Sequence, residues 1–218
     1  MCGRYALIDP DYLATRYSLE VALFQLTPNY NVAPGIEMPT ISKQSPNQGV
    51  LRRWGLIPFW AKDPAIGRRL INARGETVAA LPSFRKAIRS QRCIVPASGF
   101  YEWGHAHDRK TPYYFKPRQD QVFSLAGLYD EWNNAEGQPL RSFTIITTSA
   151  NELVAECHNR MPVILSPADE ERWLDGSTAL DDILSLLRPF PAADMERYRV
   201  STEVNNIRNN HPDLVKSV

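Results

Sequence analysis

The sequence has no long hydrophobic run. In a chain of 218 residues, the longest apolar stretches include residues 143–146 and 161–165, far short of the about 20 residues that cross a bilayer as a helix. Its first residues do not place a basic segment before an apolar one, so no signal peptide is expected. We therefore expect an intracellular protein built as one domain over residues 1–218.

Cysteine is also scarce. The three cysteines are Cys2, Cys93 and Cys157, and so small and odd a number in an intracellular chain predicts free thiols rather than a disulfide framework. No group of cysteines and histidines has the repeated close spacing of a structural zinc site. The sequence therefore predicts no metal and no other cofactor.

The chain has almost no net charge, but its charged residues are unevenly distributed along the sequence. The whole chain carries a formal charge of +1. Residues 52–92 contain ten Lys/Arg and two Asp/Glu, whereas residues 119–218 contain eight Lys/Arg and sixteen Asp/Glu. Such asymmetry is typical of a protein with one basic face for a polyanion. Charge alone equally fits arginines scattered over a solvated surface.

Local patterns indicate an α+β fold with a strand-rich centre of antiparallel or barrel-like sheets and with peripheral helices. Apolar and β-branched content predicts strands at residues 38–42, 93–95, 113–116, 121–129, 142–148 and 163–165. Capping patterns predict helices that start after Asp9, Ser83, Asn151, Ser166 and Ser177. The sequence does not determine the order of the strands.

The N-terminus has unusual chemical potential. Initiator methionine is usually removed before a small second residue, and here removal would leave Cys2 with a free α-amine beside its thiol. An aldehyde can condense with such an amine to a Schiff base, after which the thiol closes a five-membered thiazolidine ring. An internal cysteine cannot do this, because its nitrogen is an amide. Many proteins, however, begin Met-Cys by chance.

Two internal motifs place polar groups among apolar ones. Asn72 and Arg74 follow an apolar pair, so Arg74 could bind a phosphate and Asn72 could orient a sugar or carbonyl oxygen. A turn with an Arg74–Glu76 salt bridge is the alternative. Glu102 lies among aromatic residues whose packing would raise its pKa into the range of a proton carrier, and Trp103 could stack on a base. An edge strand with Glu102 pointing outward is the alternative there.

A third motif joins a short helical stretch to a strand. His158 at this junction could shuttle protons, and Arg160 would share its side in an extended segment. Cys157 beside His158 invites a thiol-protease interpretation, but neighbours in a strand face opposite ways, so a buried Cys157 is the better expectation. Elsewhere, Trp60 could stack on bases and Pro34 belongs to a turn that could line a cleft.

Six motifs occur together in a characteristic order, namely MCGRY, YNVAP, WGLIPFW, LINARGET, GFYEW and HNRMPVIL. In this combination the chain resembles the SOS response-associated peptidase (SRAP) family, from Cys2 to about Leu165 and more weakly to its end. The resemblance implies a SRAP-type fold. It also implies a sensor of abasic sites that crosslinks itself to single-stranded DNA once Met1 is removed, which in this family is associated with autocatalysis.

The resemblance implies a role for each matching residue. Cys2 would be the nucleophile, Asn72 would hold the sugar or the amine, Glu102 would be the general acid and base, and His158 would assist ring opening. The DNA-binding residues would be Arg4, Arg74, Arg160, Thr147, Trp60, Trp103 and Pro34.

The same resemblance implies a monomer that binds abasic single-stranded DNA and no membrane. Such a protein would be cytoplasmic, would reach the nucleoid when bound to damage, and could show associated lyase activity. Two other functions stay open from the residues alone. One is a thiol peptidase acting in trans through Cys2 or Cys157, and the other is a non-covalent single-stranded DNA-binding module.

Overall fold

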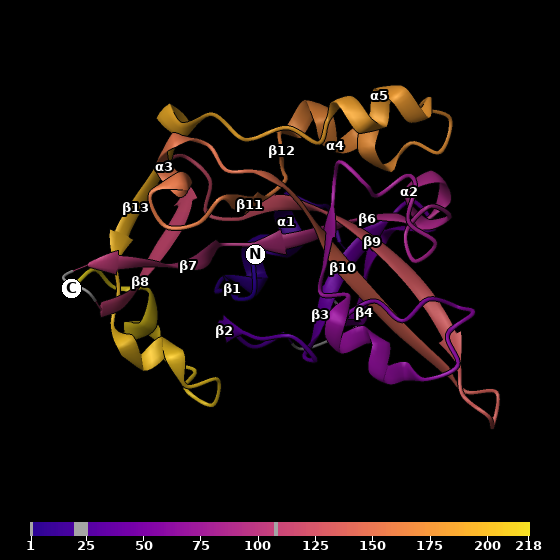
Figure 1. Cartoon of the computed structure of the whole chain (residues 1–218), viewed down its shortest axis with the longest axis horizontal. Coiled ribbons are helices and arrows are strands. Elements are labelled where there is room, and N and C mark those ends of the chain that lie inside the picture. The colour runs from indigo at the N-terminus through magenta and orange to yellow at the C-terminus, as the bar shows by residue number, and fades with distance from the viewer. Residues whose placement is uncertain (1, 20–25, 107–108) are drawn as a thin grey trace.

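Two β-sheets organise the computed structural model, which describes residues 2–19, 26–106 and 109–218 (Figure 1). The five-stranded sheet has the order β13 (Met195–Arg199), β8 (Arg109–Pro117), β7 (Gly99–Ala106), β1 (Tyr5–Leu7) and β2 (Asn29–Val32). The eight-stranded sheet has the order β11 (Arg160–Pro162), β10 (Pro139–Ser149), β4 (Ser45–Trp54), β3 (Glu37–Ser42), β6 (Arg92–Ala97), β9 (Phe123–Asn133) and β12 (Ile164–Leu165). In addition, β5 (Asn72–Arg74) pairs with β10.

The larger sheet closes on itself as a barrel. Strand β10 pairs with β4 and also with β9, so the path β10-β4-β3-β6-β9 returns to its start. All neighbours in this ring are antiparallel except β10 and β4, which are parallel. Closure leaves the five ring strands without a free edge along these pairings. This confirms the predicted strand-rich, barrel-like α+β fold.

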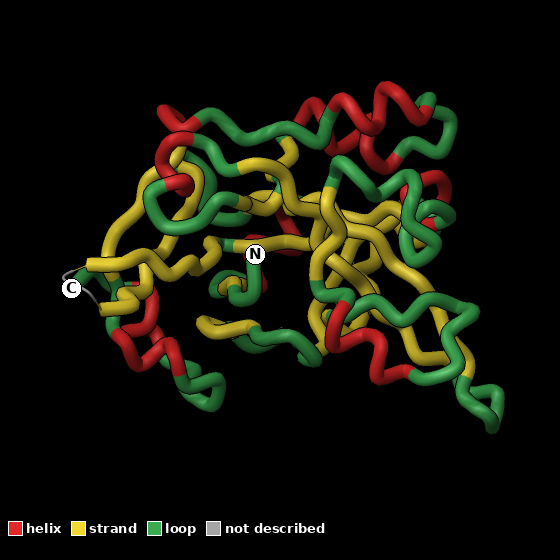
Figure 2. The backbone as a smooth tube through the Cα atoms, in the orientation of Figure 1, coloured by secondary structure: helices red, strands yellow, loops and turns green. Residues whose placement is uncertain are grey.

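Helices lie outside the strands, as Figure 2 shows in red. The α-helices are α1 (Pro10–Arg16), α2 (Ala87–Ser90), α3 (Glu152–Ala155), α4 (Pro167–Leu174) and α5 (Leu180–Ser185). The 3-10 helices are η2 (Pro64–Arg69), η3 (Ala192–Asp194), η4 (Thr202–Asn205) and η5 (Pro212–Val215). None of the helices in the described ranges is long and apolar enough to cross a membrane.

The barrel wall separates two apolar cores. Along β6, Cys93 and Val95 belong to the cluster that contains Trp54 and Phe143, whereas Ile94 belongs to the cluster that contains Trp173 of α4. Successive side chains of a strand point to opposite faces, so a strand covered on both faces is apolar throughout. This explains why the sequence of β6 shows a continuous apolar run rather than alternation.

Helix caps agree with three of the five predicted starts. Asp9 accepts a hydrogen bond from the Tyr12 amide (2.9 Å), Asn151 from the Val154 amide (2.9 Å) and Ser166 from the Asp169 amide (3.2 Å). Each cap satisfies an amide that the first helical turn leaves without a partner.

The other two predicted starts are wrong. Helix α2 begins at Ala87 rather than after Ser83, because turns occupy residues 82–86. Ser177 does not cap α5, which begins at Leu180. Its hydroxyl instead donates to Asp175 Oδ2, so the local side-chain bond competes with the cap.

The contact between β7 and β8 depends on Gly99. A Cβ at this position would lie 2.1 Å from Tyr114 Cζ, and Tyr114 is itself almost fully buried. We expect Gly99→Ala to lower the free energy of unfolding by about 3 kcal/mol, because the ring must move inside a packed core. Gly176→Ala is the matched control, since nothing lies within 4 Å of its Cβ position. Chemical denaturation measures both, and equal stability of the two variants would contradict the packing argument.

Candidate functional site

Strand pairing buries the N-terminal thiol between the two sheets. In the β1–β7 pair, Tyr5 lies opposite Phe100, and the Tyr101 amide donates to the Arg4 carbonyl (3.0 Å). Continued by three residues, this antiparallel register brings Cys2 beside the stretch that contains Glu102. The Cys2 side chain has no exposed surface.

Cys2 and Glu102 both have raised pKa values, and Glu102 contributes to the shift of Cys2. Burial raises the pKa of the Cys2 thiol far above its ordinary range, and the Glu102 carboxylate raises it further. Burial also raises the pKa of Glu102 to about 7. A carboxyl that titrates near neutrality can both give and take a proton at physiological pH. Glu102 is 4% exposed on an interior strand, so the alternative of an outward-facing carboxylate on an edge strand is wrong.

Asn72 offers a hydrogen-bond acceptor close to the same core. Its Nδ2 donates to the Ile71 carbonyl (3.0 Å), and Ile71 packs against the apolar cluster that contains Cys2. The Oδ1 atom is buried and has no hydrogen-bond partner among the residues that the structure describes. A buried polar atom without a partner is costly. Asn72 is therefore suited to bind a donor from a ligand or from the N-terminal amine.

Arg160 is held at the edge of the barrel by strand β10. Its Nη2 donates to the Thr147 carbonyl (2.6 Å) and to Glu76 Oε2 (2.9 Å). The Thr147 side chain is buried and contacts Arg160 Nη2 (3.3 Å), so it orients the guanidinium. Arg74 lies opposite Thr147 in the β5–β10 register and is exposed.

The ion pair of Glu76 is therefore with Arg160, whereas the sequence offered Arg74 as its partner. The Arg160 guanidinium lowers the pKa of Glu76 below its ordinary value. In the free protein the Glu76 carboxylate is thus bound to the Arg160 guanidinium, the group that the sequence interpretation expected to contact a DNA phosphate. Sequence spacing could not reveal this pair, because 84 residues separate its members.

His158 has a defined tautomer when it is neutral. Its Nδ1 accepts a hydrogen bond from the Arg160 amide (3.0 Å), which leaves the ring proton on Nε2. Burial lowers the pKa of His158, so the neutral ring is favoured at physiological pH. In this tautomer the neutral ring offers its Nε2–H as a hydrogen-bond donor.

Cys157, the neighbour of His158, is half-buried rather than fully buried. A Cβ on Gly104 would lie 2.9 Å from its sulfur, and Arg197 Nη1 donates to that sulfur at 3.7 Å. Burial raises the pKa of the Cys157 thiol despite the arginine. The thiolate is the reactive form of cysteine, so burial favours the unreactive thiol at Cys157, as it does at Cys2.

The C-terminal segment fixes Arg4. The Arg4 Nη1 donates to Asn31 Oδ1 (2.6 Å) and to the Val204 carbonyl (2.8 Å), and its guanidinium lies 5.8 Å from the centroid of the Trp103 ring. Trp103 in turn donates to Asn205 Oδ1 (2.7 Å). Arg4 and Trp103 therefore lie together, beside the C-terminal segment.

Asn31 is a positioning residue that the sequence interpretation missed. Its Nδ2 donates to the carbonyls of Val204, Asn206 and Asn209 at 3.3, 3.0 and 2.9 Å. It thus joins the N-terminal region to the C-terminal one while it receives Arg4. The only sequence signal was its place in a motif treated as a structured turn.

Pro34 and Trp60 line two different hollows. Pro34 borders a cavity of about 540 Å³ together with Arg53 and Arg68. Trp60 is 47% exposed and borders a separate hollow with Arg85 and Lys86. Both hollows are rich in arginine or lysine, but the structure does not join them into one cavity.

Eight of the ten basic residues in the 52–92 stretch are exposed. Arg52 and Arg92 are the exceptions, because both are buried. Among the described residues, no group of three or more His, Cys, Asp or Glu side chains could hold a metal ion.

The fold and the site together define a class: a β-barrel protein with a second sheet, in which the buried thiol of Cys2 lies near a carboxyl group that titrates close to neutrality. The chain belongs to the SOS response associated peptidase (SRAP) family, whose model matches residues 1–207.

The chain is similar to other proteins over most or all of its length. It is 45% identical over 223 residues to the abasic site processing protein YoqW of Bacillus subtilis, with all of both chains covered. It is 30% identical to the abasic site processing protein HMCES of Xenopus tropicalis, over 88% of this chain and 66% of that protein. A crystal structure of a protein from Bacteroides thetaiotaomicron matches with a TM-score of 0.93 and 33% identity over all of both chains.

The raised pKa of Glu102 predicts a pH-dependent cost to stability. Because the folded state holds the proton more tightly than the unfolded state, stability falls as the pH rises from about 4.3 through about 7. Glu102→Gln removes this titration. We expect its unfolding free energy, relative to wild type, to increase by up to about 3 kcal/mol between pH 4 and pH 9.

Denaturation at several pH values measures this difference. Glu136→Gln, in the exposed β9–β10 turn, is the control for loss of a carboxylate. A Glu102→Gln difference that stays constant across the pH range would show that the carboxyl does not titrate near neutrality.

Proposed function

We propose that this protein processes abasic sites in single-stranded DNA by forming a covalent crosslink through Cys2 after Met1 has been removed. The observation that carries the proposal is the burial of Cys2 near Glu102, whose pKa is about 7. The names of the relatives, abasic site processing proteins, support the same substrate. Met1 lies outside the described residues, so its removal, by autocatalysis or by an aminopeptidase, belongs to the proposal.

The chemistry begins with hydrolysis of the Met1–Cys2 peptide bond, which frees the amine of Cys2. That amine attacks the aldehyde carbon of the ring-opened sugar, and loss of water gives a Schiff base. The Cys2 sulfur then adds to the imine carbon while its proton passes to the nitrogen, which closes the thiazolidine. Glu102 moves these protons, because its pKa lets it act as acid and base in turn.

Other residues hold the sugar and support the proton transfers. We assign Asn72 to the sugar or the amine, through its buried Oδ1 atom. His158 assists ring opening by donating a hydrogen bond from Nε2, the nitrogen that carries the proton in the neutral ring, to an oxygen of the sugar. The Schiff base also provides a route to β-elimination, so an associated lyase activity is part of the proposal.

In this proposal three arginines and the residues near them form the path of the DNA. Arg4, Arg74 and Arg160 bind phosphates, and Thr147 contributes by orienting Arg160. Trp60, Trp103 and Pro34 shape the channel for unpaired bases. Phosphate contacts carry no sequence preference, as recognition of damage at any position requires. We propose that the protein acts as a monomer and as one domain, in the cytoplasm and on the nucleoid when bound to damaged DNA.

The test of the crosslink is a mass measurement. Wild-type protein lacking Met1 is incubated with a single-stranded oligonucleotide that carries one abasic site, and the denatured mixture is analysed for an adduct. We expect an adduct from wild type and none from Cys2→Ala, because alanine retains the amine but cannot close the ring to a stable product. Cys157→Ala is the matched control and should react like wild type.

Further variants separate chemistry from binding. Glu102→Gln should slow adduct formation at least about tenfold while DNA affinity persists, since general acid–base catalysis contributes roughly 10²–10⁴-fold.

Three outcomes would contradict the proposal. An equal yield of stable adduct from Cys2→Ala would disprove the role of the thiol. Cleavage of unrelated peptides that is lost in Cys157→Ala would support a peptidase acting in trans. DNA binding without any adduct would support the non-covalent module.

The Glu76–Arg160 pair predicts an unusual gain of affinity. Glu76 neutralises Arg160 in the free protein, and a phosphate must displace it. We expect Glu76→Gln to bind single-stranded DNA several-fold more tightly and with a steeper salt dependence. Arg74→Ala should weaken binding and reduce the salt slope by about one.

Fluorescence anisotropy titrations at several salt concentrations measure both variants. Weaker binding by Glu76→Gln would show instead that Glu76 holds Arg160 in the orientation that DNA requires.

A further inference from the structure

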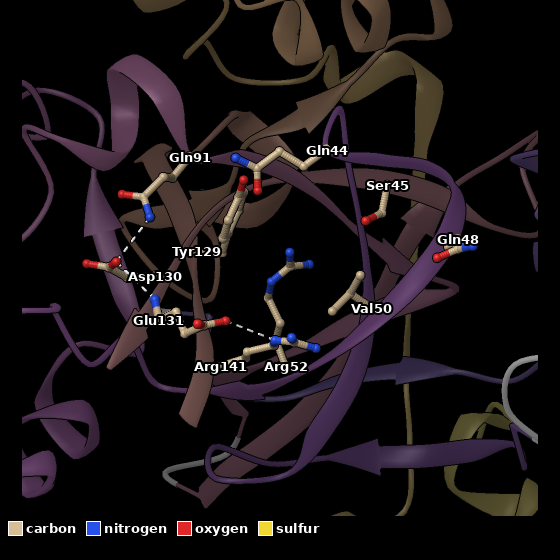
Figure 3. A pocket seen from close by; sticks show the side chains of 10 residues that line it. All are labelled: Gln44, Ser45, Gln48, Val50, Arg52, Gln91, Tyr129, Asp130, Glu131 and Arg141. Carbon is tan, nitrogen blue, oxygen red and sulfur yellow. Dashed lines mark hydrogen bonds and ion pairs between the residues drawn. The ribbon is translucent and has the colours of Figure 1, made fainter. Parts of the chain in front are cut away.

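A second polar cavity opens at one end of the barrel, apart from the thiol. Its volume is about 490 Å³, within the range of about 300–1,000 Å³ typical of small-molecule sites. Figure 3 shows the side chains that line it: Gln44, Ser45, Gln48, Val50, Arg52, Gln91, Tyr129, Asp130, Glu131 and Arg141. Its lining is thus dominated by amide and charged groups.

Arg52 is the buried cation of this cavity. It is only 5% exposed, and its guanidinium lies 4.1 Å from the centroid of the Tyr129 ring. Its Nη1 donates to the Thr40 hydroxyl and its Nη2 to the Ser42 hydroxyl (3.5 Å), whereas Nε is buried without a hydrogen-bond partner. No carboxylate of the described residues forms an ion pair with it.

The two acidic residues of the lining are already engaged. Asp130 accepts hydrogen bonds from the Phe59 amide (2.9 Å) and from Gln91 Nε2 (3.0 Å). Glu131 forms an ion pair with Arg141 at 3.0 Å. Arg52 thus carries a buried charge that hydroxyl groups and a ring solvate only in part. Such a charge is costly unless an anion accompanies it.

The cavity is separated from the thiol along strand β4. Trp54, at the end of this strand, packs against Tyr5 at 5.2 Å between ring centroids, in the core cluster that contains Cys2. The lining residues Ser45, Gln48, Val50 and Arg52 lie earlier on the same strand. Trp54 therefore lies between the cavity and Cys2 along β4, and a ligand would enter the cavity from the end of the strand that is away from Cys2.

We propose that this cavity binds a small phosphorylated molecule, of the size of a nucleoside monophosphate, whose phosphate contacts Arg52. A guanidinium has five N–H donors, and the hydroxyls of Thr40 and Ser42 use two of them. The remaining N–H groups of Nη1 and Nη2 suit the oxygens of a phosphate. The amides of Gln44, Gln48 and Gln91 supply donors and acceptors for the rest of the molecule. The site does not depend on the crosslinking chemistry proposed above.

Calorimetric titration and thermal unfolding with deoxyadenosine 5′-monophosphate test this site. We expect the nucleotide to bind and to raise the Tm of the full chain, because a ligand that binds the folded state stabilises it. Deoxyadenosine, which lacks the phosphate, should give no shift. Arg52→Met should weaken nucleotide binding at least about tenfold, since it removes hydrogen bonds to a charged group.

Three further variants locate the binding. Arg53→Met removes the same charge from the adjacent position of β4 and should bind the nucleotide like wild type, as should Arg74→Ala at the proposed DNA surface. Val50→Phe fills the cavity and leaves Arg52 intact, so it should also abolish binding even if Arg52→Met fails to fold. No Tm shift in wild type, or equal binding by wild type and Val50→Phe, would overturn the proposal.

Discussion

The burial of Cys2 between the barrel and the five-stranded sheet is the constraint on which the site depends. The β1–β7 pairing places the start of the chain against Glu102, and the contact of Tyr5 with Trp54 joins that strand to the barrel. In this enclosed position the Glu102 carboxylate disfavours ionisation of the Cys2 thiol. The thiol is therefore held in its protonated form, and the crosslinking chemistry proposed above needs a base to accept its proton, a role that the proposal gives to Glu102.

Both ends of the chain contribute to this arrangement. Asn31 accepts from Arg4 and donates to carbonyls in residues 204–209. Trp103 donates to Asn205 on the same segment. Helix η4 and the loop that follows it thus hold Arg4 and Trp103 in place. Arg4 therefore has one orientation in the free protein, and a group held in its bound orientation loses less entropy when a ligand binds.

Sequence patterns predicted the parts of the fold that local physics decides. The apolar run that forms β6 and the caps at Asp9 and Asn151 were evident, because burial and capping leave a local signature. Strand β4 was missed, since its residues 45–54 are rich in Arg, Gly and polar side chains and are fixed only by pairing with β3 and β10. The site shows the same division: residue types indicated Cys2 and Glu102, but the Glu76–Arg160 pair depends on distant parts of the chain.

Residues 52–92 show why the number of basic residues in a stretch of sequence overestimates the number that lie on the surface. Arg92 donates to the carbonyls of Ile88 and Arg89 at the end of α2 and to those of Trp173 and Asp175 at the end of α4. It thereby satisfies carbonyls that helix ends leave without partners. Arg52 points into the barrel, whereas its neighbour Arg53 is exposed. Alternation along a strand therefore divides adjacent arginines between two surfaces, so a run of positive charge in the sequence does not form one continuous basic face.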